Sequence, residues 1–477
     1  MFLTKKKYLG YLALILLGFF FRYYYSNYEN YWFDEQLSFF VANPELSFQE
    51  TLTRSYNTDL SPVLYNLILK YYFILFSYSP DLGRYLSIIT GVLGVIFLSL
   101  ISFDISKHKS VMLVLFLATF NIYLITYSAE TRPYAMIFFL SSLNIFLFFK
   151  CFISKSKNFP LIIAFLIVSI LTLLSHPFTI LIIFSQIIFI ILNNLKNKNF
   201  NISAYLFYTL VLTFYIILGY ENLKIALSFR PPEFFIKNPD ISFYTNLYFS
   251  RFFGSKTMGI IYLLIFLFLL IKNFKIIIKN NFYFFLSILF FSSLLVPILY
   301  GYIFNPILKD RYIIFILVPI ILLISNLIYD LKNIRLRKFL IFTIIISTVT
   351  NQFFEFHNKS YEKPNYNKII NELNKDTTIY ISVIAMDKIH PFMTDVKKKD
   401  PYRERHIVEN YIVNLDRLNK KFKIVEQDNI SEEIDRLWLI CQVPIVDNCE
   451  KNIRLNKNFK VENRISAYKI KSYFLKK

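Results

Sequence analysis

The chain has 477 residues, of which 55% are hydrophobic, and a formal net charge of +21 at pH 7. Apolar runs recur up to about Phe354 and then stop, which excludes an ordinary soluble protein and predicts a membrane domain followed by a soluble one. Much of the positive charge lies in short segments between the apolar runs, where it sets membrane orientation. The charge is therefore not evidence for nucleic-acid binding.

The N-terminus carries Lys5, Lys6 and Lys7 ahead of an apolar stretch that resembles a signal peptide. No small-residue cleavage site follows, and the chain continues with Arg22 and a run of tyrosines. This pattern predicts an uncleaved first transmembrane helix.

Eleven apolar runs predict membrane-spanning helices, which need about 20 residues each. They cover residues 8–25, 84–104, 110–127, 132–150, 159–175, 177–195, 201–220, 258–272, 281–303, 312–330 and 338–355. A further run, 62–78, is short and contains Pro62, Asn66 and Lys70.

The positive-inside rule decides whether residues 62–78 cross the membrane. If they do not cross, the lysine clusters between the runs all fall on the cytoplasmic side; if they do, every cluster after the first falls outside. We therefore predict an interfacial amphipathic helix at 62–78, a cytoplasmic N-terminus and an extracytoplasmic C-terminus. The acids of residues 1–355, apart from Asp104 and Asp330, then lie outside or at outer helix ends.

Residues 356–477 alternate helical and strand patterns, which predicts a small extracytoplasmic α/β domain. Strands are expected at 378–384, 422–426 and 437–443, and helices at 365–375 and 431–436. Cys441 and Cys449 could form a disulfide in an oxidising compartment, but their spacing alone leaves this open.

Two acids, Asp34 and Glu35, follow Trp32 in the predicted first outer loop, residues 26–83. A carboxylate at a membrane surface suits a general base, because partial desolvation raises its pKa toward the working pH. The alternative is a solvated acid beside an interfacial aromatic belt.

The second outer loop is short and carries Glu130, Arg132 and Pro133. Glu130 and Arg132 could belong to a site, or they could simply form an ion pair that caps a helix, since Pro133 suits the first turn of a helix. The predicted topology brings Asp34 and Glu130 to the same membrane face.

Few cations lie on the outer side, and Arg84, Lys309 and Arg311 are among them. They could neutralise a lipid phosphate or pyrophosphate, for which the planar arginine fork is well suited, or simply snorkel at the interface. His176 is a weak candidate metal ligand. An interface histidine satisfied by hydrogen bonds is the favoured interpretation, because metal sites need several converging ligands.

Several short motifs, taken in order, resemble the C-superfamily (GT-C) glycosyltransferases, in particular the protein O-mannosyltransferase and aminoarabinose-transferase-like group of bacterial membrane enzymes. The motifs are Trp32-Phe33-Asp34-Glu35, Ser61-Pro62-Val63-Leu64-Tyr65, Gly83-Arg84-Tyr85-Leu86-Ser87, Glu130-Thr131-Arg132-Pro133-Tyr134-Ala135 and Arg311-Tyr312. The likeness covers residues 1–355. The chain departs from the family at Ser61-Pro62-Val63, where His-Pro-Pro is frequent, so any role of that histidine is absent or moved.

The resemblance implies an inverting glycosyltransferase of the cell inner (cytoplasmic) membrane. It would move a sugar from a polyprenyl-phosphate donor to a glycan, lipid or protein acceptor at the outer face. Asp34 would be the base that deprotonates the acceptor, Glu35 would support it, and Glu130 would orient the acceptor or a cation.

The remaining site residues that the resemblance implies fall into two groups. Candidates for donor-phosphate binding are Arg84, Arg132, Lys309 and Arg311, and candidates for lining the substrate are Trp32, Tyr65, Tyr134 and Tyr312. A divalent cation, Mg²⁺ or Mn²⁺, is an open expectation, because the acids could bind one although no ligand set requires it.

The main alternative is a polytopic transporter or lipid flippase for glycan precursors; a non-catalytic scaffold and a glycan polymerase or ligase are others. Transporters usually place ionisable groups near the bilayer midplane, often within repeated halves. Here the middles of the apolar runs are almost free of charge, and no internal repeat is convincing. The pattern favours the glycosyltransferase.

Overall fold

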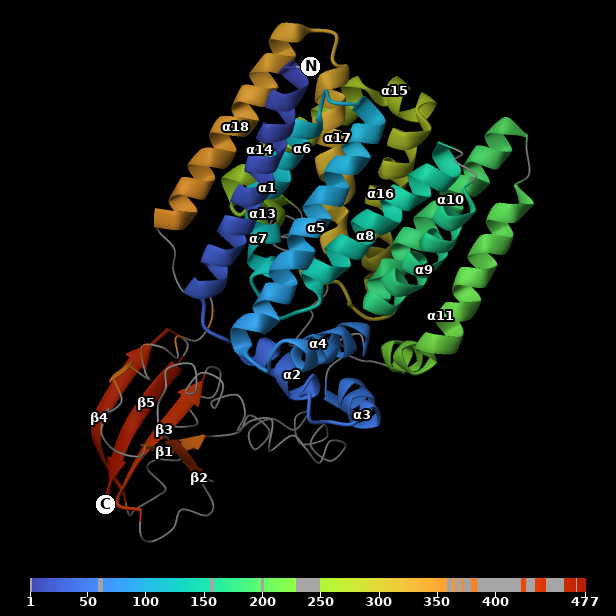
Figure 1. Cartoon of the computed structure of the whole chain (residues 1–477). Coiled ribbons are helices and arrows are strands. Elements are labelled where there is room, and N and C mark those ends of the chain that lie inside the picture. Colours follow the sequence, from blue (N-terminus) through green and yellow to red (C-terminus); the bar gives the residue numbers. More distant parts are fainter. Residues whose placement is uncertain are drawn as a thin grey trace. The chain divides into compact units, whose positions relative to one another are not determined.

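A computed structural model of the chain comprises two compact units (Figure 1). It describes residues 2–58, 63–154, 158–198, 201–228, 249–357, 363, 365, 368, 371–372, 379–383, 422–425, 434–442, 459–468 and 470–477. The first unit consists of Met1–Tyr25, Ser61–Ile68 and Arg84–Asn358, and the second of Ser26–Leu60, Leu69–Gly83 and Lys359–Lys477. The first unit is helical, whereas the second combines short helices with a sheet.

Long apolar helices account for most of the chain up to His357. They are α1 (Phe2–Tyr28), α5 (Pro80–Ser106), α6 (Val111–Thr119), α7 (Ile122–Ser128), α8 (Tyr134–Phe148), α9 (Phe159–Ser175), α10 (Ile180–Asn197), α11 (Ile202–Ser228), α14 (Lys256–Lys272), α16 (Asn281–Ile303), α17 (Leu317–Asp330) and α18 (Ile334–His357). Shorter elements lie between them: η1 (Phe149–Ile153), η2 (Pro177–Thr179), α13 (Phe249–Phe253), α15 (Phe274–Lys279) and η3 (Asp310–Ile316).

Eight helical segments within the described part of the chain are long and apolar enough to cross a membrane, and the bent pair α6–α7 makes a ninth. The other two predicted spans correspond to α9 and α14, which are helical but have 17 residues each. At 1.5 Å per residue such a helix is about 25 Å long, slightly less than the hydrocarbon core of about 30 Å. The predicted polytopic α-helical membrane protein is confirmed.

One predicted span, 110–127, is broken in its middle. α6 and α7 meet at an angle of 58°, with Phe120 and Asn121 at the break. The Asn121 carboxamide oxygen accepts a hydrogen bond from the backbone N–H of Leu124 at 2.9 Å, and its amide donates to the Phe252 carbonyl at 2.8 Å. The Asn121 side chain thus satisfies a backbone N–H that the break frees and ties the break to α13.

The centre of the helical unit is η3 followed by α17. Every residue from 313 to 328 is buried, so this span is enclosed by protein rather than by lipid. α17 packs against α6, α14, α16 and α18. The burial of α17 explains why its apolar residues continue around the whole helix instead of forming one stripe.

Four neighbouring helices are joined by a buried polar chain. Asn144 of α8 donates to the Ser169 hydroxyl of α9 at 3.0 Å, and Gln186 of α10 donates to the Asn144 carboxamide oxygen at 2.7 Å. Tyr208 of α11 donates to the Gln186 carboxamide oxygen at 3.0 Å. Such hydrogen bonds hold membrane helices together where burial of apolar surface supplies little driving force between them.

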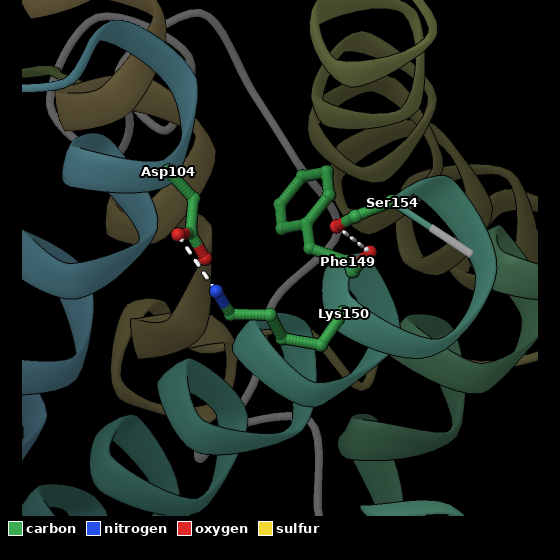
Figure 2. A network of polar contacts seen from close by, with 4 residues as sticks. All are labelled: Asp104, Phe149, Lys150 and Ser154. Atoms are coloured by element: carbon green, nitrogen blue, oxygen red, sulfur yellow. Dashed lines mark hydrogen bonds and ion pairs between the residues drawn. The ribbon is translucent and has the colours of Figure 1, made fainter. Parts of the chain in front are cut away.

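At its C-terminal end, α8 continues into the π-helical turn η1 (Figure 2). There Lys150 forms an ion pair with Asp104 of α5 at 2.8 Å, and the Ser154 hydroxyl donates to the Phe149 carbonyl at 2.8 Å (Figure 2). The pair links α5 to α8, and the serine closes the wide turn at the helix end.

The helical part of the second unit contains α2 (Phe33–Val41), α3 (Phe48–Thr58) and the end of α4 (Val63–Leu75). α3 begins with a capping box, in which Ser47 and Glu50 exchange side chain–backbone hydrogen bonds of 2.8 and 3.1 Å. These bonds hold the pKa of Glu50 below its ordinary value. With 13 residues, α4 is too short to span, in keeping with the prediction that 62–78 does not cross.

Lys70 of α4 ties α4 to α3 and to the segment before it. Its ammonium group donates to the Leu46 carbonyl and, at 3.1 Å, to the Thr51 hydroxyl. Burial lowers the pKa of Lys70, and these bonds offset part of the cost of placing its charge there.

The sheet of the second unit has five strands in the order β2-β1-β3-β5-β4. The strands are β1 (Ile379–Val383), β2 (Phe422–Val425), β3 (Arg436–Gln442), β4 (Lys460–Ala467) and β5 (Ile470–Lys476). β1 pairs in parallel with β2 and β3, and β5 pairs antiparallel with β3 and β4. This mixed sheet confirms a small α/β domain.

Sequence patterns predicted three of these strands and missed the β4–β5 hairpin. β4 is largely exposed and polar, so it lacks the alternation that marks a half-buried strand. The predicted helix at 431–436 is wrong in its described part, because Arg436 begins β3 and the two residues before it are not helical. The open question of whether Cys441 pairs with Cys449 lies outside the described side chains.

Candidate active site

The turn between α7 and α8 is buried rather than solvated. Glu130, Arg132 and Tyr134 all have almost no exposed surface. The backbone N–H of Arg132 donates to the Glu130 carbonyl at 2.8 Å, and Pro133 precedes the first residue of α8 with a helical φ of −66°. The chain therefore inserts a carboxylate and a guanidinium into the protein at this turn.

A second element brings another arginine to the same place. The guanidinium carbons of Arg132 and Arg311 lie 6.0 and 5.6 Å from the ring centroid of Tyr134. Arg311 also lies 5.9 Å from the ring centroid of Tyr312, its neighbour in η3. We call Arg132, Tyr134, Arg311 and Tyr312 the arginine–tyrosine cluster. All four were predicted as site residues, and the packing of η3 against α8 brings them together.

Two acids accompany the arginine–tyrosine cluster. Glu130, Asp310 and Arg311 all lie within electrostatic range of the Tyr127 hydroxyl, and the Tyr127 ring centroid is 5.0 Å from that of Tyr134. Sequence reasoning gave no role to Tyr127. The sequence feature that could have indicated Tyr127 is its spacing from Tyr123, because residues four apart share one face of a helix. The centroids of these two rings lie 4.6 Å apart.

Asp310 is held by Arg251 of α13, with 3.0 Å between a guanidinium nitrogen and a carboxylate oxygen. The Asp310 carboxylate keeps the pKa of Arg251 above its ordinary value. This ion pair fixes the start of η3, and with it the position of Arg311.

His176 lies beside the arginine–tyrosine cluster. Its ring centroid is 4.9 Å from that of Tyr312, and its Nδ1 accepts a hydrogen bond from the backbone N–H of Phe178 at 3.2 Å. The histidine thus caps η2 and packs against a site tyrosine. Among the described residues, no group of three or more histidine, cysteine or acidic side chains could hold a metal.

Arg22 of α1 is a further buried cation, and sequence reasoning assigned it no role. It has 0% exposure, and it donates to the Ser128 hydroxyl at 3.2 Å and to the Gly18 carbonyl at 3.0 Å. Gly91 of α5 makes the space, since a Cβ there would lie 2.2 Å from the Ser128 hydroxyl oxygen. Arg22 therefore anchors the end of α7 next to the Glu130 turn.

Three predicted residues occupy separate elements. Arg84 is buried near the start of α5, Tyr65 is buried in α4, and Lys309 is half-buried immediately before η3. Their assignments to donor binding and substrate lining stay predictions.

The motif with the predicted base belongs to the second unit. Trp32 has extended backbone (φ −112°, ψ 172°) and caps α2, and its carbonyl accepts a hydrogen bond from the Glu35 backbone N–H at 3.0 Å. Asp34 and Glu35 occupy the first turn of α2, where the helix dipole favours negative charge. Asp34 is half-buried and Glu35 is 0% exposed, so Asp34 is the acid that solvent or a substrate can reach.

No protein-family model matches the chain, and no curated protein does. Solved structures match over most of its length. ArnT from Cupriavidus metallidurans bound to undecaprenyl phosphate superposes with a TM-score of 0.56 at 8% identity, covering 97% of each chain. The archaeal oligosaccharyltransferase AglB from Archaeoglobus fulgidus, in complex with an inhibitory peptide and a dolichol-phosphate, reaches 0.50 at 12% identity, covering 85% of this chain and 60% of that one.

The chain therefore has the GT-C fold of membrane glycosyltransferases, as its motif order predicted. At such low identity the likeness establishes the architecture, and residue roles have to be argued from the site itself.

Proposed function

We propose that this protein is an inverting glycosyltransferase that moves a sugar from a polyprenyl-phosphate donor to an acceptor at the outer face of the cytoplasmic membrane. The convergence of Arg132 and Arg311 on Tyr134, in a chain with the GT-C fold, is the observation that carries the proposal. Guanidinium groups bind phosphate oxygens through paired, charge-assisted hydrogen bonds, so a lipid phosphate bound here could be held from two elements at once. The neighbours with bound undecaprenyl phosphate and dolichol-phosphate support a donor of this chemistry.

In the proposed reaction, Asp34 is the general base. Its carboxylate accepts the proton of an acceptor hydroxyl or amine as that group attacks the anomeric carbon from the side opposite the phosphate. The bond between the anomeric carbon and the phosphate oxygen breaks, and its electron pair leaves with the polyprenyl phosphate. A positioned base contributes about 10²–10⁴ in rate.

The arginines act on the leaving group. Negative charge builds on the phosphate oxygen as the bond breaks, and Arg132 and Arg311 would stabilise it with paired hydrogen bonds. Arg84 and Lys309 are further candidates for this role, and Glu130 for orienting the acceptor. Removing one charge-stabilising donor typically costs about 10²–10³ in rate.

A divalent cation could be shared between this chain and the substrate phosphate. The described residues offer no three-ligand set, but Mg²⁺ is commonly held by one or two carboxylates together with substrate phosphates. Asp34 would supply a carboxylate, and Mg²⁺ or Mn²⁺ would neutralise phosphate charge. Dialysis against a chelator followed by a transfer assay tests this requirement.

The proposed orientation has the N-terminus in the cytoplasm and the C-terminal region outside. It is supported by the placement of lysines between the apolar runs. Reporter fusions at the C-terminus that are active only in one compartment test it. A cytoplasmic C-terminus would contradict both the topology and the outer-face reaction.

The central experiment compares cells that carry the wild-type chain, Asp34→Asn or Glu45→Gln. Mass spectrometry of surface glycans and lipids should show a sugar-modified product that Asp34→Asn lacks, although the variant is inserted in the membrane. Glu45 is an exposed acid of the same unit and serves as the control, so Glu45→Gln should retain the product. Near-normal product from inserted Asp34→Asn would contradict the assignment of the base.

A further inference from the structure

Lys363, near the start of the C-terminal region, lies against the motif that carries the predicted base. Its side chain is buried, with 7% of the residue exposed, and its ammonium nitrogen lies 5.2 Å from the centroid of the Trp32 ring. Both residues belong to the second unit. A cation over the face of an indole is attracted by the ring, more strongly than over any other aromatic side chain and more so when water is excluded.

The segment that carries Lys363 is fastened to the sheet. The backbone N–H of Asn365 donates to the Tyr468 carbonyl in the β4–β5 turn at 3.0 Å. The Asn365 side chain accepts from the backbone N–H of Lys368 at 3.1 Å, and the Lys368 ammonium group donates to the Ser466 carbonyl at 3.1 Å. Lys363 is therefore held two residues from an anchored point of the hairpin.

Trp32 occupies the N-cap position of α2 and contributes to the first turn through its backbone. Its carbonyl accepts the Glu35 N–H, and Asp34 lies between the two residues in the first turn. A shift of the indole ring would move this turn and the Asp34 carboxylate with it. A misplacement of about 1 Å in a catalytic group can cost about 100-fold in rate, so support of this turn bears directly on catalysis.

We propose that Lys363 is a positioning residue, which holds the Trp32 ring and through it the first turn of α2. The C-terminal sheet then supports the active site instead of forming a separate appendage. The catalytic consequence rests on the proposed function, whereas the contact between Lys363 and Trp32 does not.

The contact can be tested without any activity assay, because the chain contains only two tryptophans, Trp32 and Trp438. Protein labelled with 5-fluorotryptophan should show two ¹⁹F resonances, which Trp438→Phe assigns. Lys363→Gln should shift the Trp32 resonance and leave that of Trp438, in β3, in place. Lys460→Gln, which removes an exposed lysine from β4, should move neither resonance.

These resonances separate positioning from a loss of folding. A variant that disrupts the sheet would move the Trp438 resonance as well. An unchanged Trp32 resonance in Lys363→Gln would overturn the contact and the proposal with it.

Activity tests the second half of the proposal. In Lys363→Gln, kcat should fall about tenfold with KM for the lipid donor within about twofold of wild type, since the donor site is untouched. Lys363→Arg should recover most of the loss, because a guanidinium also binds an indole face. A shifted Trp32 resonance with unchanged kcat would overturn the positioning role. An inactive wild-type protein would refute the proposed function instead, while the fluorine experiment would still decide the contact.

Discussion

The two ends of helix α8 use positive charge in different ways. At the η1 end, Lys150 forms an ion pair with one carboxylate, that of Asp104 on α5 (Figure 2). The Lys150 side chain is 33% exposed and the Asp104 side chain 19%. At the Tyr134 end, two arginines from separate elements share one buried ring. The first arrangement balances charge one to one and joins two helices. The second brings two guanidinium groups from separate elements to one ring, with Glu130 nearby, which is the mixture of groups that we propose binds the donor phosphate and orients the acceptor.

The largest expected effect concerns the arginine–tyrosine cluster. Arg311→Gln and Arg132→Gln should each lower transfer by about 10²–10³, because each removes a donor of hydrogen bonds to the developing phosphate charge. Turnover of purified variants with a lipid-linked sugar measures this. Lys150→Gln removes a cation at the other end of the same helix and should leave turnover near wild type. A loss of turnover in Lys150→Gln as large as in the arginine variants would contradict a specific role of the Tyr134 end.

The shared ring is expected to matter less than the cations. Tyr134→Leu removes the ring beside which both guanidiniums lie and should weaken binding of polyprenyl phosphate about tenfold, as expected for the loss of two buried cation–π contacts. Tyr134→Phe keeps the ring and should bind within about twofold of wild type. Titration of the lipid phosphate measures both variants. Weak binding by Tyr134→Phe would show that the hydroxyl, and not the ring, is required.

The buried polar chain that joins the middle of α8 to α10 and α11 through Gln186 of α10 should contribute to stability and not to transfer. Gln186→Leu leaves Asn144 and Tyr208 without the hydrogen bonds that Gln186 makes to them, and should lower the free energy of unfolding by about 1–2 kcal/mol. Thermal unfolding in detergent measures the loss, with transfer at low temperature as the second observable. A large loss of transfer in a stably folded Gln186→Leu variant would show that this polar chain also takes part in the reaction.

The smallest effect is expected at the Lys150–Asp104 pair. Because the pair is partly exposed, a double-mutant cycle with Lys150→Met and Asp104→Asn should give a coupling below about 1 kcal/mol that falls as salt is added. Unfolding at two ionic strengths measures it. A coupling well above this value would mean that the η1 end, too, depends on buried charge.

Prediction from sequence worked best for the membrane helices. Apolar length is a local property, and each of the eleven predicted runs corresponds to helix in the structure. The break at Asn121 could not be seen in the same way, because its hydrogen-bond partner, the Phe252 carbonyl, lies in a distant part of the chain. The β4–β5 hairpin was missed because β4 is mostly exposed and polar and therefore lacks the alternation of a half-buried strand.

The same contrast applies to the site. The resemblance singled out Asp34, Glu130, Arg132 and Arg311, because its short motifs contain them and few cations lie on the predicted outer side. It did not indicate Arg22, Asp310, Arg251 or Lys363 as partners, since each acts through a neighbour from another element.

The amino-acid sequence by itself determined that this chain enters a membrane repeatedly, because about 20 consecutive apolar residues are stable in hydrocarbon wherever they occur. Only the tertiary structure decided which charges converge. Helix packing brought Arg311 onto the ring of Tyr134, and the sheet brought Lys363 onto the ring of Trp32. The physical reason is that hydropathy belongs to a segment, whereas the field at a site is the sum of charges that the fold places side by side.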